Sequence, residues 1–411
     1  MSNAILVVGG GFSGITAALE AAELGHDVYI VEKTPWLGGR VAQLNKYFPK
    51  LCPPSCGLEI QFQRIRKNPR VKCFTQARIV ELSGKKGDYR VRVSIAPRGT
   101  PPHAVDYSLL ASALDGETEN EFDLGLGKRK ALYKPMPFAY PPRYALDRET
   151  LSRSDLARVA GNDQIDTTSE GREAEIEVGA IVVATGWQPY AMAKLANLGG
   201  GNVKNCISNM QLERLASPFG PTGGRILRPS DKRPPRSVAF VQCAGSRDQN
   251  HLNYCSYICC MATLKHCQYI AEQLPEAHIT VFYIDLRAPG RYASVLEKVQ
   301  AQPNVRFIKG KVADAAQAEG DRVRLTAEDA LRAERLTLEY DLAVLATGMQ
   351  PSLAKDSLPL PLPLDEDGFI AGGEEAGIFA AGCARMPLDV TRSAQSGTAA
   401  ALKAVQTVKG R

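Results

Sequence analysis

Glycines near the start of the chain have the spacing of a phosphate-binding loop. Gly9, Gly11 and Gly14 form a G-x-G-x-x-G pattern between an apolar run at residues 4–8 and a helical pattern at about 15–24. In such a loop the first glycine permits a tight turn and the second lets the backbone approach a pyrophosphate. The third lets the helix pack on the strand, while the helix N-terminus attracts the anion. Because strand, loop and helix follow one another directly, the pattern predicts a dinucleotide-binding βαβ unit.

The acidic residue expected in such a unit is also present. A second apolar run at residues 28–31 ends at Glu32. A carboxylate at this strand end can accept hydrogen bonds from an adenosine ribose. We therefore expect Glu32 to contact the bound dinucleotide.

Grouped cysteines are the second set of residues that could carry chemistry. Six of the ten cysteines lie in two groups, Cys52 with Cys56, and Cys243 with Cys255, Cys259 and Cys260. No signal peptide is visible, and a chain of this size is expected to be cytosolic, where grouped cysteines bind metal or do redox chemistry. Four thiolates suit a [4Fe–4S] cluster or a structural zinc ion. The C-x11-C-x3-C-C spacing lacks the paired C-x2-C knuckles typical of zinc sites, so it favours iron–sulfur; zinc and unligated core cysteines stay open as alternatives.

The elements around the second group should bring its thiols together. Cys243 directly follows an apolar strand predicted at 237–242, and a helix is predicted at about 255–273. Residues four apart lie on one face of a helix, so Cys255 and Cys259 are expected on the same face, with Cys260 adjacent. The end of a strand is where doubly wound folds bind ligands.

Composition limits the other functions that the chain could have. The 411 residues are 44% apolar and 23% charged, which is enough for two or three domains with cores of their own. The net charge of +6 is a mild excess spread along the chain, so no concentrated basic face for nucleic acid is expected. The longest apolar runs are far shorter than the roughly 18–20 residues of a membrane span. The five histidines show no ligand spacing, and no Ser/His/Asp arrangement is present, so we expect no general acid or base.

Repeated signatures indicate two dinucleotide-type units. Strands predicted at 176–187 and 340–349 both end in Ala-Thr-Gly, which suggests that a second α/β unit is inserted between them. A Pro/Arg-rich linker at 225–236 precedes the strand of that unit, and an irregular Pro-rich excursion covers about 96–170. The predicted domains are a first FAD-type part at 1–212, an inserted unit at 213–335 and a C-terminal part at 336–411.

With Gly377–Cys383 and a helix expected at about 391–408, this arrangement resembles the two-dinucleotide-domain flavoproteins of the glutathione and thioredoxin reductase type. The resemblance implies an α/β fold, a doubly wound FAD domain and FAD as the ligand of the glycine loop. Cys383 stands where the family commonly has Asp, which weakens the expected contact to the ribityl chain. The expected FAD contacts are Gly9, Gly11, Phe12, Ser13, Gly14, Glu32, Lys33, Gly39, Arg40, Ala77, Arg78, Thr185, Gly186, Gly382, Cys383, Val390 and Thr391.

A closer resemblance lies in three motifs. The C-A-G-S-R-D run from Cys243 with the following cysteines, the segment 120–133 (NEFDLGLGKRKALY) and the segment 283–288 (YIDLRA) are similar to the A subunits of heterodisulfide reductases. That family implies FAD and a [4Fe–4S] cluster held by Cys243, Cys255, Cys259 and Cys260. Full-length members carry further ferredoxin-type clusters, whereas this sequence has no C-x2-C-x2-C run.

In this respect the chain resembles the short, ferredoxin-free A subunits of quinone-interacting membrane-bound oxidoreductases. Those proteins pass electrons between menaquinol and adenylylsulfate reductase in dissimilatory sulfur metabolism. The implied partners are adenylylsulfate reductase, another soluble flavin/iron–sulfur protein of the complex and its membrane-bound quinone/haem component. The implied location is the cytoplasm, at a membrane reached through these partners.

Other functions stay open. Cys52 and Cys56 form a C-x3-C pair that could be the dithiol of an NAD(P)H-dependent disulfide reductase. The inserted unit, however, retains only Gly245 of a second glycine loop. The remaining alternative is a zinc-stabilised FAD scaffold with no catalytic role of its own.

Overall fold

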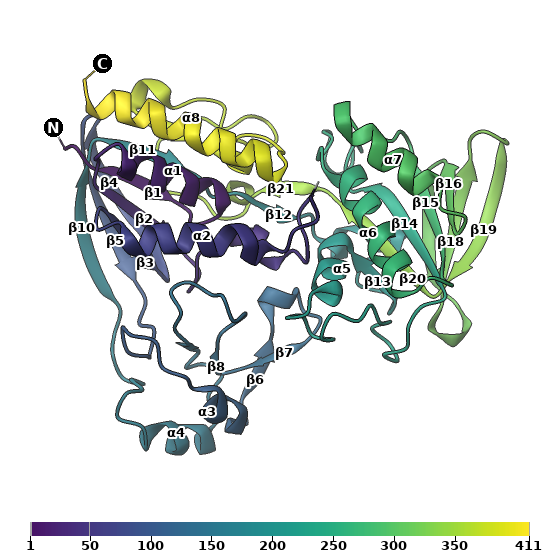
Figure 1. Cartoon of the computed structure of the whole chain (residues 1–411), viewed down its shortest axis with the longest axis horizontal. Coiled ribbons are helices and arrows are strands. Elements are labelled where there is room, and N and C mark those ends of the chain that lie inside the picture. The colour runs from purple at the N-terminus through teal and green to yellow at the C-terminus, as the bar shows by residue number, and fades with distance from the viewer. Residues whose placement is uncertain (1, 49, 411) are drawn as a thin grey trace.

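The computed structural model describes residues 2–48 and 50–410, which form two main lobes of similar architecture (Figure 1). Each lobe has a five-stranded parallel sheet, with helices on one face and a three-stranded antiparallel sheet on the other. The two faces of each parallel sheet are buried, and the strands are accordingly almost continuous apolar runs. The predicted doubly wound α/β class with a second α/β unit is confirmed.

The first lobe carries the glycine loop. Its parallel sheet consists of β22 (Ile378–Ala380), β11 (Ala180–Val183), β1 (Ile5–Val8), β2 (Val28–Glu32) and β3 (Val71–Thr75), in that order. One face of this sheet is covered by the helices α1 (Phe12–Glu23), α2 (Pro54–Lys67) and α8 (Val390–Val408). The other face is covered by the antiparallel sheet of β10 (Arg172–Val178), β5 (Asp88–Ile95) and β4 (Ala77–Lys85). Helix α1 begins at Phe12, earlier than predicted, because Gly11 already serves as its N-cap.

The strand predicted at 176–187 is in fact two strands. Residues 172–178 form β10 in the antiparallel sheet, whereas residues 180–183 form β11 in the parallel sheet. Gly179 lies at the break, where an added Cβ would overlap the carbonyl oxygen of Ser2. A glycine is therefore needed where the chain crosses between the two layers.

The second lobe carries the cysteine group. Its parallel sheet consists of β13 (Cys206–Ser208), β20 (Leu342–Thr347), β14 (Ser237–Ala244), β15 (His278–Tyr283) and β16 (Val305–Lys309), in that order. Helices α5 (Asn209–Ala216), α6 (Cys259–Gln273) and α7 (Ala293–Gln300) cover one face, and β17 (Val312–Gln317), β18 (Val323–Asp329) and β19 (Glu334–Tyr340) cover the other. Because β20 pairs with both β14 and β13, this lobe extends beyond the predicted span of 213–335 at both ends.

The chain enters and leaves the second lobe through paired segments. Strand β12 (Trp187–Pro189) pairs antiparallel with β21 (Met349–Pro351), between the lobes in Figure 1. Each of these strands directly follows one of the Ala-Thr-Gly turns noted in the sequence. The repeated signature thus marks both crossings between the lobes.

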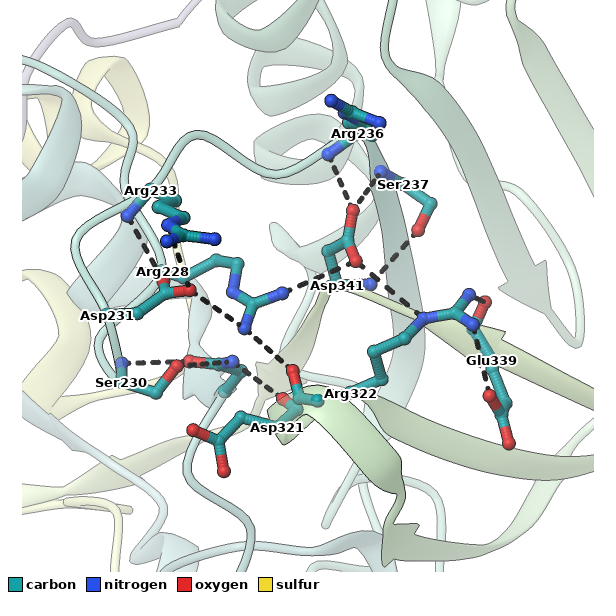
Figure 2. Close-up of polar contacts among 12 residues, drawn as sticks. Arg228, Ser230, Asp231, Arg233, Arg236, Ser237, Asp321, Arg322, Glu339 and Asp341 are labelled. Atoms are coloured by element: carbon teal, nitrogen blue, oxygen red, sulfur yellow. Dashed lines mark hydrogen bonds and ion pairs between the residues drawn. The ribbon is translucent and has the colours of Figure 1, made fainter.

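The Pro/Arg-rich linker at 225–236 is attached to the second lobe by Asp341. This carboxylate accepts hydrogen bonds from the backbone N–H groups of Arg236 (2.7 Å) and Ser237 (3.2 Å), as Figure 2 shows. Arg228 (3.5 Å) and Arg322 (3.7 Å) pair with its other oxygen. A carboxylate that pairs with several donors holds its neighbours in one geometry, so the start of β14 is fixed.

The excursion at 96–170 forms a small lobe of its own. Its elements are α3 (Ser108–Ala113), β6 (Glu117–Glu119), the 3-10 helix η2 (Glu121–Asp123), β7 (Lys128–Lys130), β8 (Leu132–Tyr133), β9 (Ala145–Leu146) and α4 (Arg153–Ala160). Asp123 accepts a hydrogen bond from the buried Arg214 of α5 at 2.8 Å, which ties this lobe to the second one. Among the helices of residues 2–48 and 50–410, none is long and apolar enough to cross a membrane.

Candidate functional site

A cavity of about 1200 Å³ is lined by residues from both main lobes. At one end it is lined by Gly9, Gly11 and Glu32 of the first lobe. At the other end it is lined by Cys259 and Lys265 of α6 in the second lobe. The predicted dinucleotide loop and part of the cysteine group therefore border the same space.

The three glycines of the loop have different surroundings. An added Cβ at Gly9 would overlap the carbonyl oxygen of Ala184, and one at Gly14 would overlap that of Gly9. At Gly11, by contrast, the nearest atom to an added Cβ is the Cα of Gly39, 3.9 Å away. The first and third glycines permit close packing, whereas the second keeps open a space that a side chain would fill.

Glu32 is buried at the cavity wall and already holds the loop. Its carboxylate accepts hydrogen bonds from the backbone N–H groups of Gly10 (2.7 Å) and Thr34 (2.8 Å) and from the Thr34 hydroxyl (2.8 Å). A carboxylate has about four lone-pair sites. Capacity to accept a ribose hydroxyl therefore remains.

Two polar side chains at the cavity wall have hydrogen-bonding capacity that the described residues leave unused. Burial lowers the pKa of Arg40 to about 10. The guanidinium donates to the Trp187 carbonyl (3.3 Å) and to Gln43 (2.8 Å), but it makes no ion pair with any described residue. The Thr185 hydroxyl is buried and, within residues 2–48 and 50–410, has no hydrogen-bond partner. Together with the open space at Gly11, these groups fit an anionic, hydrogen-bonding ligand such as FAD.

Most of the other predicted FAD contacts also line this cavity: Phe12, Ser13, Lys33, Gly39, Ala77, Arg78, Gly186, Cys383 and Val390. Gly14, Gly382 and Thr391 do not. An added Cβ at Gly382 would overlap the Ser13 hydroxyl, and the Thr391 residue is exposed. The sequence reasoning missed Asp356, which lines the cavity and pairs with Lys33 (2.8 Å) and Arg78 (3.1 Å).

Local irregularities position the cysteine group. The register of β14 against β20 shifts between Val241 and Ala244, and Cys243 within this bulge has a left-handed φ of 56°. A bulge re-aims the side chain that it carries. Helix α6 begins at Cys259, so Cys259 and Cys260 lie in its first turn.

The prediction that Cys255 and Cys259 share one helix face is wrong. Cys255 lies in the loop before α6, and the chain turns at Tyr257, whose φ is 66°. The backbone N–H of Tyr257 donates to the Cys255 sulfur at 3.3 Å. The thiols thus come from a strand end, a loop and a helix start.

The four thiols lie within electrostatic range of one another. Burial raises the pKa of Cys259 well above its usual value, and the charges of Cys243, Cys260 and Cys255 raise it further. The pKa values of Cys243 and Cys260 are likewise raised, first by burial. As the side chains lie, no group of three or more His, Cys, Asp or Glu residues in the described chain could hold a metal ion. The number and type of the sulfur donors nonetheless match what a [4Fe–4S] cluster requires.

A buried charged group at the same cavity was missed by the sequence reasoning. Glu213 of α5 pairs with Lys265 (2.7 Å) and His266 of α6. Lys265 also donates to the carbonyl of Lys46 (2.6 Å), and Glu213 accepts from the backbone N–H of Asn45 (2.9 Å). These contacts tie α5 and α6 to the first lobe. Their residues are far apart in sequence, so spacing alone gives no signal.

Cys52 and Cys56 do not line the cavity, although they lie close to it. Tyr47 lines the cavity, and its backbone N–H donates to the Cys52 carbonyl at 2.9 Å. Burial raises the pKa of Tyr47, and both thiols raise it further. Gly57 packs close to the Tyr47 hydroxyl. The thiol pair is therefore set back from the space in which FAD would bind.

Comparison with known proteins agrees with this geometry. Residues 4–64 match the FAD dependent oxidoreductase family. The chain is 39% identical, over 97% of its length, to an iron–sulfur A subunit of CoB–CoM heterodisulfide reductase from Methanopyrus kandleri. It is 33% identical, over 98% of its length, to the A subunit of an H2:CoB-CoM heterodisulfide,ferredoxin reductase from Methanothermobacter marburgensis. Over nearly its whole length the chain is therefore similar to A subunits of heterodisulfide reductases.

The chain spans 63% and 64% of the lengths of these two relatives. Solved structures with a similar fold include the thioredoxin reductases from T. acidophilum (TM-score 0.52, 14% identity) and from Lactococcus lactis (TM-score 0.54, 12% identity). Both alignments cover all of this chain, and they cover 99% and 100% of the two solved chains. At this identity the likeness concerns the fold alone. The thioredoxin-reductase-like two-dinucleotide-domain architecture expected from the sequence is confirmed.

Proposed function

We propose that the chain is a flavin and iron–sulfur electron-transfer protein within a larger complex. The observation that carries this proposal is the single cavity that extends from the glycine loop to Cys259. FAD would be held by the loop around Gly11, by Glu32 and by Arg40, and a [4Fe–4S] cluster by Cys243, Cys255, Cys259 and Cys260. When bound, FAD supplies two-electron chemistry and the cluster takes electrons singly.

We further propose that the chain is the A subunit of a quinone-interacting membrane-bound oxidoreductase. Support comes from the motifs shared with heterodisulfide reductase A subunits and from the lack of a C-x2-C-x2-C run ahead of the segment 120–133, where the full subunits carry one set of clusters. In this role it passes electrons between the menaquinone pool and adenylylsulfate reductase. Its other partners are a second soluble flavin/iron–sulfur protein and a membrane-bound quinone/haem component of the complex, and it works in the cytoplasm at the membrane surface.

The cysteine ligands can be tested by replacing each of the four with Ala and measuring iron and flavin in anaerobically purified protein. Wild-type protein should hold about four irons per chain. Each variant should lose or degrade the cluster but keep its FAD, because FAD is held mainly by the first lobe. Cys267→Ala is the matched control, since Cys267 lies farther along α6 in the buried core and should leave the iron content unchanged. Iron retained in all four variants, or zinc in its place, would refute the assignment.

A disulfide reductase using Cys52 and Cys56 is the second candidate. Neither cysteine lines the cavity, which counts against this candidate, because a dithiol that exchanges electrons with flavin must reach the flavin directly. Reduction of a Cys52–Cys56 disulfide by the protein's own flavin during NADPH turnover would favour this candidate.

A further inference from the structure

The segment 120–133 of the small lobe forms part of the cavity wall. Asn120, Glu121 and Phe122 all line the cavity. The backbone carbonyl of Phe122 accepts a hydrogen bond from Nε2 of Gln43 at 3.1 Å. The small lobe therefore contacts the first lobe directly at the cavity, through the side chain of Gln43.

Gln43 is held through both its side chain and its backbone. Its Oε1 accepts a hydrogen bond from Nη1 of Arg40 at 2.8 Å, so the amide joins Arg40 to Phe122. Its backbone carbonyl accepts from Nη1 of Arg214 at 3.0 Å. Gln43 is only 6% exposed. Because a carbonyl oxygen can only accept and a guanidinium can only donate, these partners fix which end of the amide faces Arg40.

Arg40 has donors left for a ligand. Of the five N–H groups of a guanidinium, described residues accept only from Nε and Nη1. The preceding residue, Gly39, lies beside Gly11, since a Cβ added at Gly11 would be 3.9 Å from the Gly39 Cα. Gly11 is where the backbone leaves room for the pyrophosphate of FAD. The positive charge of Arg40 thus belongs to the part of the chain where negative charge is expected.

We propose that Gln43 is a positioning residue that holds the Arg40 guanidinium for the pyrophosphate of FAD, and that the segment 120–133 takes part in FAD binding through it. The inference rests on the FAD site of the proposed function. A long arginine side chain loses much rotamer entropy when a ligand fixes it, and a prior contact reduces that cost. Gln43 supplies the contact as a neutral acceptor, so the charge of Arg40 is not cancelled, as a carboxylate partner would cancel it.

The test is the dissociation constant of FAD, measured by titrating the full-length apoprotein with FAD and following the flavin fluorescence. Gln43→Met keeps a similar volume and removes both side-chain hydrogen bonds, so it should weaken FAD binding about tenfold. In an Arg40→Met background the same substitution should change the dissociation constant by less than about twofold, because its effect passes through Arg40. Gln43→Glu gives Arg40 an ion-pair partner and should weaken binding at least as much as Gln43→Met.

Gln211 provides a matched control. Its Nε2 donates to the Leu124 carbonyl at 3.1 Å, which is a bond to the same segment and of the same kind as that of Gln43. Gln211 does not line the cavity. Gln211→Met should therefore leave the dissociation constant of FAD within about twofold of wild type.

Each outcome decides for or against the proposal. An unchanged dissociation constant in Gln43→Met would overturn it. An equal loss of affinity in the Arg40→Met background, or in Gln211→Met, would also overturn it, because Gln43 would then act through the cavity wall and not through Arg40. If Gln43→Met does not fold, Gln43→Asn replaces it; this side chain is too short to bond both partners, and the same loss of about tenfold is expected. Wild-type apoprotein that binds no FAD would instead refute the FAD site itself.

Discussion

Gly11 differs from the other glycines of its loop because its missing side chain leaves space in the cavity and not against backbone. We therefore predict that Gly11→Val folds with a stability within about 1 kcal/mol of wild type but loses FAD. Gly14→Val should instead destabilise the first lobe by roughly 1–3 kcal/mol or more through overpacking, since its Cβ would overlap the Gly9 carbonyl. Flavin absorbance per chain and thermal unfolding of the apoprotein measure the two effects. Full FAD occupancy in Gly11→Val would show that the loop does not bind the pyrophosphate.

The stability of the fold should depend on pH through Glu213. Burial alone would raise the pKa of Glu213, but Lys265 and His266 favour the ionised carboxylate and lower its pKa to about 2. A carboxyl whose pKa is lower in the folded state stabilises the fold above the unfolded pKa, about 4.3 for Glu. That stability is lost as the pH falls through the folded pKa. We predict that Glu213→Gln costs about 3–5 kcal/mol of unfolding free energy at pH 7, because Lys265 stays buried without its partner.

Urea unfolding of wild type and Glu213→Gln between pH 7 and pH 3 tests this linkage. The difference in stability between the two proteins should be largest above about pH 5 and should shrink as the pH falls. A difference that stays constant over this range would mean that Glu213 acts through packing and not through its charge.

Among the elements, the end of β14 lacks the glycine loop that a nicotinamide dinucleotide would need. The strand ends in a bulge that contains Cys243. Gly245 is the one glycine that follows, whereas a dinucleotide loop needs several. A Cβ added at Gly245 would press on the Tyr190 ring, so this glycine serves packing. NADH and NADPH should therefore reduce the flavin no faster than nonspecifically. Stopped-flow absorbance near 450 nm, roughly the oxidised-flavin band, provides the measurement. Rapid and saturable bleaching would favour the disulfide reductase.

How much the sequence could predict depended on how local the signal was. The βαβ unit around Gly9–Gly14 follows from apolar runs and turns that lie next to one another in the chain. The helix predicted at 255–273 begins four residues late because the loop around Tyr257 takes a left-handed turn that spacing does not reveal. Asp356 and Glu213 were missed, since their places at the cavity depend on packing between segments far apart in the chain.

For the whole molecule, buried polar contacts hold the lobes in a fixed arrangement around the cavity. The fully buried Arg214 joins the second lobe to the excursion through Asp123 and to the first lobe through the Gln43 carbonyl, at 3.0 Å. Lys265 makes a second connection to the first lobe at the carbonyl of Lys46. The glycine loop and Cys259 are thereby held on opposite sides of one cavity.

Stepwise anaerobic photoreduction of the purified holoprotein would show whether one chain holds both FAD and a [4Fe–4S] cluster. Flavin absorbance, the EPR signal of a reduced cluster and the iron and zinc contents would be measured on the same samples. We predict one FAD and about four irons per chain, with flavin bleaching and a cluster signal arising in the same titration. Flavin that bleaches without any cluster signal, in protein that holds zinc or no metal, would contradict the claim.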